Sequence, residues 1–171
     1  TPTCPGLSTP GIGRIHIRIV RSNDRLLTMS TVSEDALRAA AVQLAKQLKP
    51  GQCVLFFGPM GVGKTTMISE MVTSLGGQET VSSPTFALAH HYPSVPPTMH
   101  LDLYRLENPG DLLSIDIDRY LYDMDHIVLV EWAERLGEYT PSSYIRVDLH
   151  FFGPATRMLT ITPVSPQQAA C

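Results

Sequence analysis

Residues 58–65 have the types and the spacing of a loop that binds phosphate. Their sequence, Gly-Pro-Met-Gly-Val-Gly-Lys-Thr, matches the pattern G-x-x-x-x-G-K-[ST] directly after the apolar run 53–57. The glycines allow backbone N–H groups to turn toward the α- and β-phosphates, while Lys64 can reach the β- and γ-phosphates and the Thr65 hydroxyl can hold Mg²⁺. We therefore expect a nucleoside triphosphate to be bound by this loop: Gly58, Met60, Gly61, Val62, Gly63, Lys64 and Thr65.

Two carboxylates could complete a magnesium site. Glu131 follows the apolar run 127–130, at the end of a predicted buried strand, whereas Asp102 lies in the less continuous apolar run 100–105. Each also has a structural alternative, because Glu131 could cap the next helix and Asp102 could pair with Arg105. The two acids therefore compete for the place of the carboxylate that binds the metal with Thr65, and the sequence leaves open which of them contacts Mg²⁺ directly.

Other polar residues give weaker signals. Thr85 could reach the γ-phosphate or Mg²⁺ as a switch residue, or it could only stabilise its own turn. Arg105 could stabilise charge on a transferred phosphoryl group or form a surface ion pair. His90, His91 and His100 lack metal-ligand spacing, so we expect packing or surface roles for them.

The elements that must position these residues alternate between helices and strands. A capping box from Thr31 to Glu34 predicts a helix that ends at 49–51, and a second helix over 64–75 would begin at the phosphate loop. Asn108 and Pro109 predict the start of another helix. Strands are predicted over 52–57, 86–91, 99–103, 126–130, 144–151 and 158–162, the last two as a hairpin. This order predicts a three-layer α/β fold whose central sheet is mostly parallel, with antiparallel strands at its edge.

Length and composition narrow the class of protein. A chain of 171 residues with 43% hydrophobic and 17% charged residues fits a single globular domain without a membrane span. A net charge of −3 argues against extensive direct contact with RNA phosphates. The cysteines are odd in number and widely spaced, which predicts no disulfide partner and no zinc site and fits a reducing, cytoplasmic compartment: Cys4, Cys53 and Cys171.

We expect three parts along the chain. Residues 1–25 would form a partly disordered N-terminal extension, in which alternating isoleucines and basic residues over 14–19 could add an edge strand. The basic start also allows an organelle-targeting remnant, which is the less favoured interpretation. Residues 26–163 would form the phosphate-loop domain and 164–171 a disordered tail.

Four sequence blocks stand out along the chain: residues 58–66, Ser83-Pro84-Thr85-Phe86, His100-Leu101-Asp102-Leu103-Tyr104-Arg105-Leu106, and Leu129-Val130-Glu131-Trp132 with Glu134-Arg135 after it. Together they resemble one family, the TsaE (YjeE) ATPases, over residues 27–163. The Asp-Leu-Tyr-Arg-Leu and Val-Glu-Trp segments are more specific than the phosphate loop alone. The resemblance implies the three-layer fold of P-loop NTPases. One departure is Pro59-Met60, where the family usually has Asp-Leu, because Pro59 cannot donate an N–H.

The resemblance implies roles for individual residues and for the whole chain. Family members are weak Mg²⁺-dependent ATPases that support formation of N6-threonylcarbamoyladenosine next to the anticodon, in tRNAs that read codons beginning with A. They act with a threonylcarbamoyl transferase subunit and its inactive sugar-kinase-like paralogue, so tRNA would be reached indirectly through that complex. ATP and Mg²⁺ are the implied ligands. The implied site has Lys64, Thr65 and Thr66 at the phosphates and metal, Asp102 and Glu131 at the metal and attacking water, Thr85 in a switch loop, Trp132 beside the site, and Thr31 near the adenine.

Two other functions remain open on the sequence. Asp118-Arg119-Tyr120 resembles a nucleoside-kinase element and would fit a small-molecule, nucleoside-like kinase, although it lies on a predicted helix and no arginine-rich lid follows it. A GTP-operated switch is disfavoured because the guanine-reading pattern N/T-K-x-D is absent. Adenine is therefore preferred by elimination.

Overall fold

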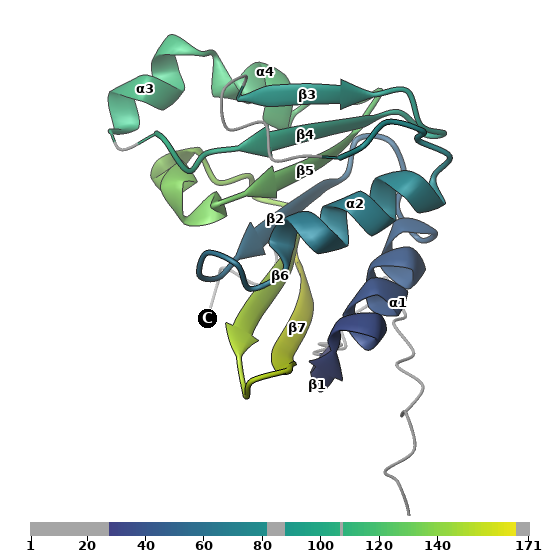
Figure 1. The fold of residues 1–171 in the computed structure, drawn as a ribbon. Helices are drawn as coiled ribbons and strands as arrows, with labels where there is room; N and C mark the ends of the chain where they lie inside the picture. The colour runs from purple at the N-terminus through teal and green to yellow at the C-terminus, as the bar shows by residue number, and fades with distance from the viewer. Residues whose placement is uncertain (1–27, 82–87, 107, 167–171) are drawn as a thin grey trace, which may run out of the picture.

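The computed structural model describes residues 28–81, 88–106 and 108–166. Helices and strands alternate along these residues (Figure 1). The strands are β1 (Thr28–Ser33), β2 (Cys53–Phe57), β3 (Ala89–Tyr92), β4 (Thr98–Asp102), β5 (Ile127–Glu131), β6 (Tyr144–Phe151) and β7 (Thr156–Val164). The helices are α1 (Glu34–Ala45), α2 (Lys64–Ser74), α3 (Pro109–Ser114) and α4 (Ile117–Leu121), followed by a 3₁₀ segment, η1 (Ala133–Tyr139).

A single sheet joins the seven described strands in the order β1-β7-β6-β2-β5-β4-β3. Strands β6, β2, β5 and β4 pair in parallel, while β3 on one side and β7 and β1 on the other pair antiparallel. This arrangement confirms the predicted α/β fold with a parallel centre and antiparallel edges. Because β2, β4 and β5 run in parallel, their carboxyl ends meet at one edge of the sheet, where such folds bind ligands.

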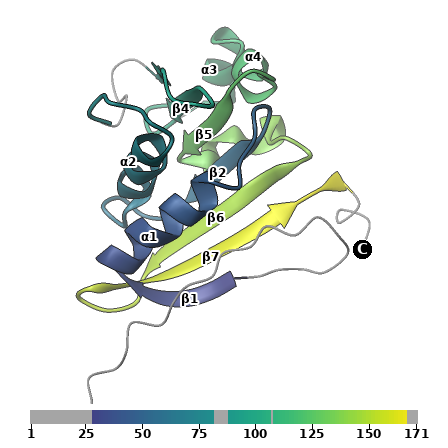
Figure 2. The ribbon, with the colours of Figure 1, turned by 90° about the vertical axis from the view of Figure 1, so that its right-hand side faces the viewer.

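The two faces of the sheet carry separate hydrophobic cores. Successive strand side chains point to opposite faces, so Val54 and Phe56 of β2 pack with α1 and α2, whereas Cys53 and Leu55 pack with α3, α4 and η1. Figures 1 and 2 show α1 and α2 lying together over one face. The same alternation in β5 places Leu129 with the α2 side and Val130 with the other side. Three layers therefore result, as predicted.

The beginning of the first helix differs from the prediction. The N-cap is Ser33, whose hydroxyl accepts a hydrogen bond from the backbone N–H of Ala36 at 3.3 Å, so the expected capping box from Thr31 to Glu34 is wrong. Thr31 instead lies in β1, opposite Met158 of β7. Antiparallel pairing with β7 keeps this segment extended for two residues longer than the local hydroxyl pattern indicated.

Several expectations concern the ends of the chain. Strand β7 continues to Val164, a residue that was expected in the tail. Residues 1–25 and the possible strand at 14–19 lie outside the described residues. None of the described helices combines the length and the apolar character needed to cross a membrane. Burial raises the pKa of the Cys53 thiol to about 12, as expected for an inert packing residue.

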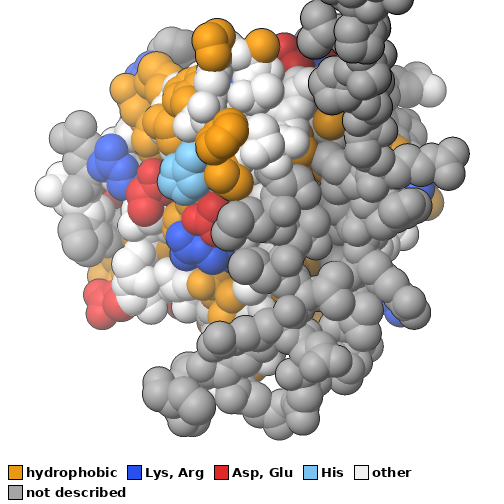
Figure 3. All heavy atoms as spheres, turned by 90° about the horizontal axis from the view of Figure 1, so that it is seen from below, with side chains coloured by type: hydrophobic (Ala, Val, Ile, Leu, Met, Phe, Trp, Pro, Cys, Tyr) orange, Lys and Arg blue, Asp and Glu red, His pale blue; other side chains and the backbone are white. Residues whose placement is uncertain are grey.

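The β6–β7 hairpin packs against the phosphate loop. Arg157 of β7 donates from Nε to the carbonyl of Val62 at 3.1 Å, and its guanidinium lies 4.9 Å from the centre of the Phe151 ring. Phe151 and Phe152 remain exposed near the tip. Figure 3, viewed from below, shows hydrophobic side chains beside charged ones on that side of the molecule. Arg157 thus connects the β6–β7 hairpin to the phosphate loop.

Candidate functional site

Three glycines let the loop between β2 and α2 turn tightly. Gly58, Gly61 and Gly63 have φ angles of 136°, 74° and 116°, which side chains rarely tolerate. A Cβ added at Gly58 would lie 2.2 Å from the carbonyl oxygen of Leu149, and one at Gly63 would lie 2.8 Å from Leu37. The backbone conformation therefore favours glycine at all three positions, and at Gly58 the close approach of the β6 backbone also requires it.

The loop ends at the N-terminus of α2, where backbone N–H groups have no partners within the helix. No acidic residue lies in the first turn of α2, and Gly63 at the N-cap provides no side-chain hydrogen bond. The positive end of the helix dipole and these N–H groups are therefore available to an anion. This geometry is what the sequence pattern predicted for phosphate.

Lys64 folds back over the loop. Its Nζ donates to the carbonyls of Gly58 and Pro59, at 2.6 and 2.9 Å. The Pro59 carbonyl also accepts from the N–H of Val62 at 3.4 Å, so the outer turn is held by the proline oxygen and does not need the missing N–H. Burial lowers the pKa of Lys64, although the charge of Glu131 opposes that shift.

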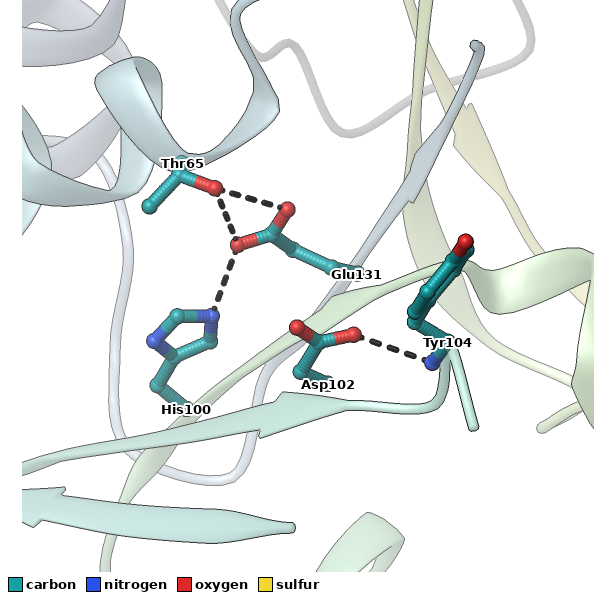
Figure 4. A network of polar contacts seen from close by, with 5 residues as sticks. All are labelled: Thr65, His100, Asp102, Tyr104 and Glu131. Atoms are coloured by element: carbon teal, nitrogen blue, oxygen red, sulfur yellow. Dashed lines mark hydrogen bonds and ion pairs between the residues drawn. The ribbon is translucent and has the colours of Figure 1, made fainter. Parts of the chain in front are cut away.

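Thr65, Glu131 and His100 form a chain of polar contacts, in which Thr65 is partly buried (Figure 4). The Thr65 hydroxyl lies 2.8 Å from Oε1 and 2.9 Å from Oε2 of Glu131, and Nε2 of His100 lies 3.0 Å from Oε1. Glu131 is 3% exposed and His100 is fully buried. Glu131, at the end of β5, therefore contacts the Thr65 hydroxyl and does not cap η1.

Asp102 lies beside Glu131 at the end of β4, because the two residues are directly opposite in the parallel ladder. Its Oδ1 accepts from the backbone N–H of Tyr104 at 2.9 Å, which fixes the carboxylate at the start of the turn that leaves the strand. The side chain is buried but borders the same cavity as Glu131. The two acids that the sequence singled out are thus brought together.

Trp132 forms one wall of the site. Its backbone adopts φ 57° and ψ 43°, a left-handed conformation that is uncommon for a bulky residue. The turn brings the indole ring to 4.0 Å from Nζ of Lys64 and to 4.9 Å from the ring of Tyr104, measured between ring centres. Attraction between a cation and an aromatic face stabilises such a contact by about 0.5–2 kcal/mol.

These side chains enclose a cavity of about 290 Å³. Tyr104 was not expected there and comes from the Asp-Leu-Tyr-Arg block. Among the expected residues, Gly58 and Val62 in the loop and Thr31 in β1 do not line the cavity. Thr85 lies outside the described residues. The lining consists of Met60, Gly61, Gly63, Lys64, Thr65, Thr66, Asp102, Tyr104, Glu131 and Trp132.

The contact between His100 and Glu131 was not predicted from the sequence. We expected a packing or surface role for His100, and it is buried, but it also contacts the carboxylate of Glu131. A signal was present, because residues two apart in a strand share a face and His100 precedes Asp102 by two. Arg105, by contrast, lies exposed on the turn after β4.

The oxygen atoms of Thr65 and Glu131 suit a hard cation whose remaining ligands are phosphate oxygens and water molecules. A hydroxyl and a carboxylate meet at the N-terminus of α2, whereas the described residues contain no group of three or more His, Cys, Asp or Glu side chains that could cage a metal. Mg²⁺ usually keeps phosphate oxygens and waters and takes few protein ligands. The residues present therefore fit Mg²⁺ bound with a triphosphate.

Comparison with known proteins shows the family of this chain. A sequence model of the family described as "Threonylcarbamoyl adenosine biosynthesis protein TsaE" matches residues 31–157. The chain belongs to the TsaE family. The TsaE protein of Nostoc sp. is 34% identical over 144 residues, which cover 82% of this chain and 88% of that protein. The Bacillus subtilis TsaE protein is 32% identical over 139 residues, covering 81% and 86%.

A solved structure has the same fold. The crystal structure of Bacillus subtilis YdiB superposes with a TM-score of 0.67 and 26% sequence identity, covering 85% of this chain and 91% of that one. The family model and the two TsaE relatives confirm the resemblance to TsaE proteins that the sequence blocks indicated. The matched region includes the loop, Asp102, Glu131 and Trp132.

Proposed function

We propose that this chain is an ATP-binding and ATP-hydrolysing subunit required for forming N6-threonylcarbamoyladenosine in tRNA. The observation that carries the proposal is the contact of Thr65 with the buried Glu131 at the N-terminus of α2, beside Lys64, in a chain of the TsaE family. The names of its relatives point to the same biosynthetic pathway. The proposed target is the adenosine 3′ of the anticodon in tRNAs that read codons beginning with A.

Binding of the triphosphate would use the loop and the start of α2. Backbone N–H groups hold the phosphates, and the ammonium group of Lys64 moves from the carbonyls of Gly58 and Pro59 to the phosphate oxygens. This exchange replaces two neutral acceptors by charged ones, which strengthens the hydrogen bonds. Trp132 lies over the same ammonium group and limits where it can move.

Hydrolysis would divide the work between the two acids. Thr65 and Glu131 would hold Mg²⁺, which when bound neutralises charge on the phosphate oxygens. Asp102 lies next to Glu131 and lines the cavity, so its carboxylate orients the attacking water and accepts its proton. The walls formed by Trp132 and Tyr104 limit access of bulk water.

We propose that the partners are a threonylcarbamoyl transferase subunit and its inactive sugar-kinase-like paralogue. A chain with a net charge of −3 is poorly suited to hold tRNA by itself, so tRNA contact through these partners fits its composition. A cytoplasmic location is consistent with the free, buried Cys53.

The kinase alternative is less well supported by the geometry. Asp118, Arg119 and Tyr120 lie on α4, and none of them lines the cavity that contains Lys64 and Glu131. A phosphoryl acceptor near that tripeptide would not meet the phosphate loop. We therefore retain only the ATPase function.

Phosphate release is the direct test. The purified chain is assayed with ATP or GTP, with Mg²⁺ or with a chelator, alone and with the two partners plus tRNA, and Lys64→Ala serves as the inactive control. We expect slow, Mg²⁺-dependent release from ATP that depends on Lys64, together with ATP-dependent tRNA modification by the complex. Modification that proceeds equally well with Lys64→Ala, or a clear preference for GTP, would contradict the proposal.

A further inference from the structure

The two carboxylate oxygens of Glu131 are not equivalent. Nε2 of His100 contacts Oε1, whereas the Thr65 hydroxyl, which has a single hydrogen to donate, lies within hydrogen-bond distance of both Oε1 and Oε2. A carboxylate oxygen has two lone pairs, and the histidine takes one of those on Oε1. Oε2 keeps acceptor capacity for a further ligand or a water molecule.

The position of His100 follows from the register of the sheet. His100 is opposite Leu129 in the parallel pairing of β4 with β5, and Glu131 is two residues beyond Leu129 on the same face. The imidazole also stacks on the buried Tyr92 ring, with 6.3 Å between the ring centres and 26° between the planes. Packing and register together hold the ring in one place.

The surroundings of His100 also select its tautomer. Nε2 faces a carboxylate and must carry a hydrogen to donate to it, while Nδ1 is buried with no hydrogen-bond partner among the described residues. If Nδ1 carried a hydrogen, a buried donor would be left unsatisfied. The neutral ring with its hydrogen on Nε2 leaves only an acceptor unpaired. His100 is therefore a fixed donor to Oε1.

We propose that His100 is a positioning residue that sets which oxygen of Glu131 faces the metal and the phosphates. Its hydrogen bond occupies Oε1 and leaves Oε2 directed to the cation held by Thr65. Groups that orient a metal ligand commonly change metal affinity or activity by about 10–100-fold when they are removed. The inference rests on the proposed function, because it assigns His100 to the same site.

Three substitutions separate this role from packing. His100→Leu removes the donor and puts an apolar side chain of similar volume in its place. In His100→Gln the amide nitrogen is as many bonds from Cα as Nε2 of histidine is, so it can donate to the same oxygen. His100→Asn places its amide nitrogen one bond nearer the backbone. If positioning matters, the Gln variant restores function and the Leu and Asn variants do not.

Two readouts are measured on each variant after its melting temperature confirms that it is folded. The first is kcat for ATP hydrolysis, and the second is the Mg²⁺ concentration that gives half of the change in Trp132 fluorescence with a non-hydrolysable ATP analogue bound. Trp132 is the single tryptophan of the chain and lines the site. We expect His100→Leu to lower kcat and raise that Mg²⁺ concentration by about 10–100-fold. Affinity for the analogue without Mg²⁺ should change less than about threefold, because His100 does not contact the phosphate loop.

The outcomes distinguish the two proposals. Wild-type protein that binds no nucleotide would overturn both the proposed function and the role of His100. Normal Mg²⁺ dependence in His100→Leu, or a Gln variant as defective as the Leu variant, would overturn the role of His100 alone. If His100→Leu or His100→Asn unfolds the chain, the His100→Gln variant is compared with the double variant that carries both His100→Gln and Glu131→Gln. A Gln variant with wild-type behaviour whose metal dependence is lost in the double variant supports the proposal, and a Gln variant with weakened metal dependence contradicts it.

Discussion

The hydroxyl of Thr65 contacts both carboxylate oxygens of Glu131, across 66 residues of sequence, at 2.8 and 2.9 Å. A hydroxyl that gives its hydrogen to a carboxylate turns its own lone pairs elsewhere, which is the orientation that a cation needs. Oδ1 of Asp102 accepts instead from the backbone N–H of Tyr104. This difference separates the expected behaviour of the two acids.

Glu131→Gln and Asp102→Asn should both lower ATP turnover, by about 100-fold or more, because each acts on the transition state. Only Glu131→Gln should also raise the Mg²⁺ concentration needed for half-maximal activity, since Glu131 holds the metal together with Thr65. Titration of Mg²⁺ at saturating ATP compares the two. Equal metal dependence in both variants would contradict the division of roles.

Substitution of two loop glycines should have unequal costs. Gly58→Ala places a methyl group 2.2 Å from a backbone oxygen of β6, and Gly61→Ala meets nothing within 4 Å although its φ is also positive. We expect Gly58→Ala to reduce the free energy of unfolding by about 2–4 kcal/mol and Gly61→Ala by about 1 kcal/mol. Urea unfolding of the two variants measures the difference, and similar midpoints would argue against the close contact with Leu149.

The pH dependence of stability should reveal the buried Lys64. Burial lowers its pKa in the folded chain from the ordinary 10.5, so in the interval below 10.5 the unfolded chain holds more protons. The free energy of unfolding therefore increases as the pH rises through that interval. We expect wild-type protein to gain stability relative to Lys64→Met over the same interval. A difference between their urea midpoints that stays constant with pH would contradict this expectation.

The phosphate loop could be predicted from sequence because its information is local. The residues of the pattern Gly-x-x-x-x-Gly-Lys-Thr both shape the loop and provide its polar groups, so no distant contact is needed to recognise it. The strand ending at Glu131 was recognisable for a similar reason, since its apolar run is continuous. Local patterns of this kind account for the central strands and for α2.

Other features depend on pairing between distant segments. Strand β1 forms because β7 pairs with it, and this moves the helix cap from Thr31 to Ser33. The contact between His100 and Glu131 depends on the register of β4 against β5, which no local pattern specifies. Tyr104 enters the cavity only because the turn after Asp102 folds toward Trp132.

The Leu149 carbonyl beneath Gly58 has a consequence for affinity. The first residue of the loop is wedged against a central strand, and Arg157 holds the Val62 carbonyl from the neighbouring one. The loop has therefore already lost its conformational entropy when the chain folds. A ligand that enters this site does not have to order the loop, so little of its binding energy is spent on that step.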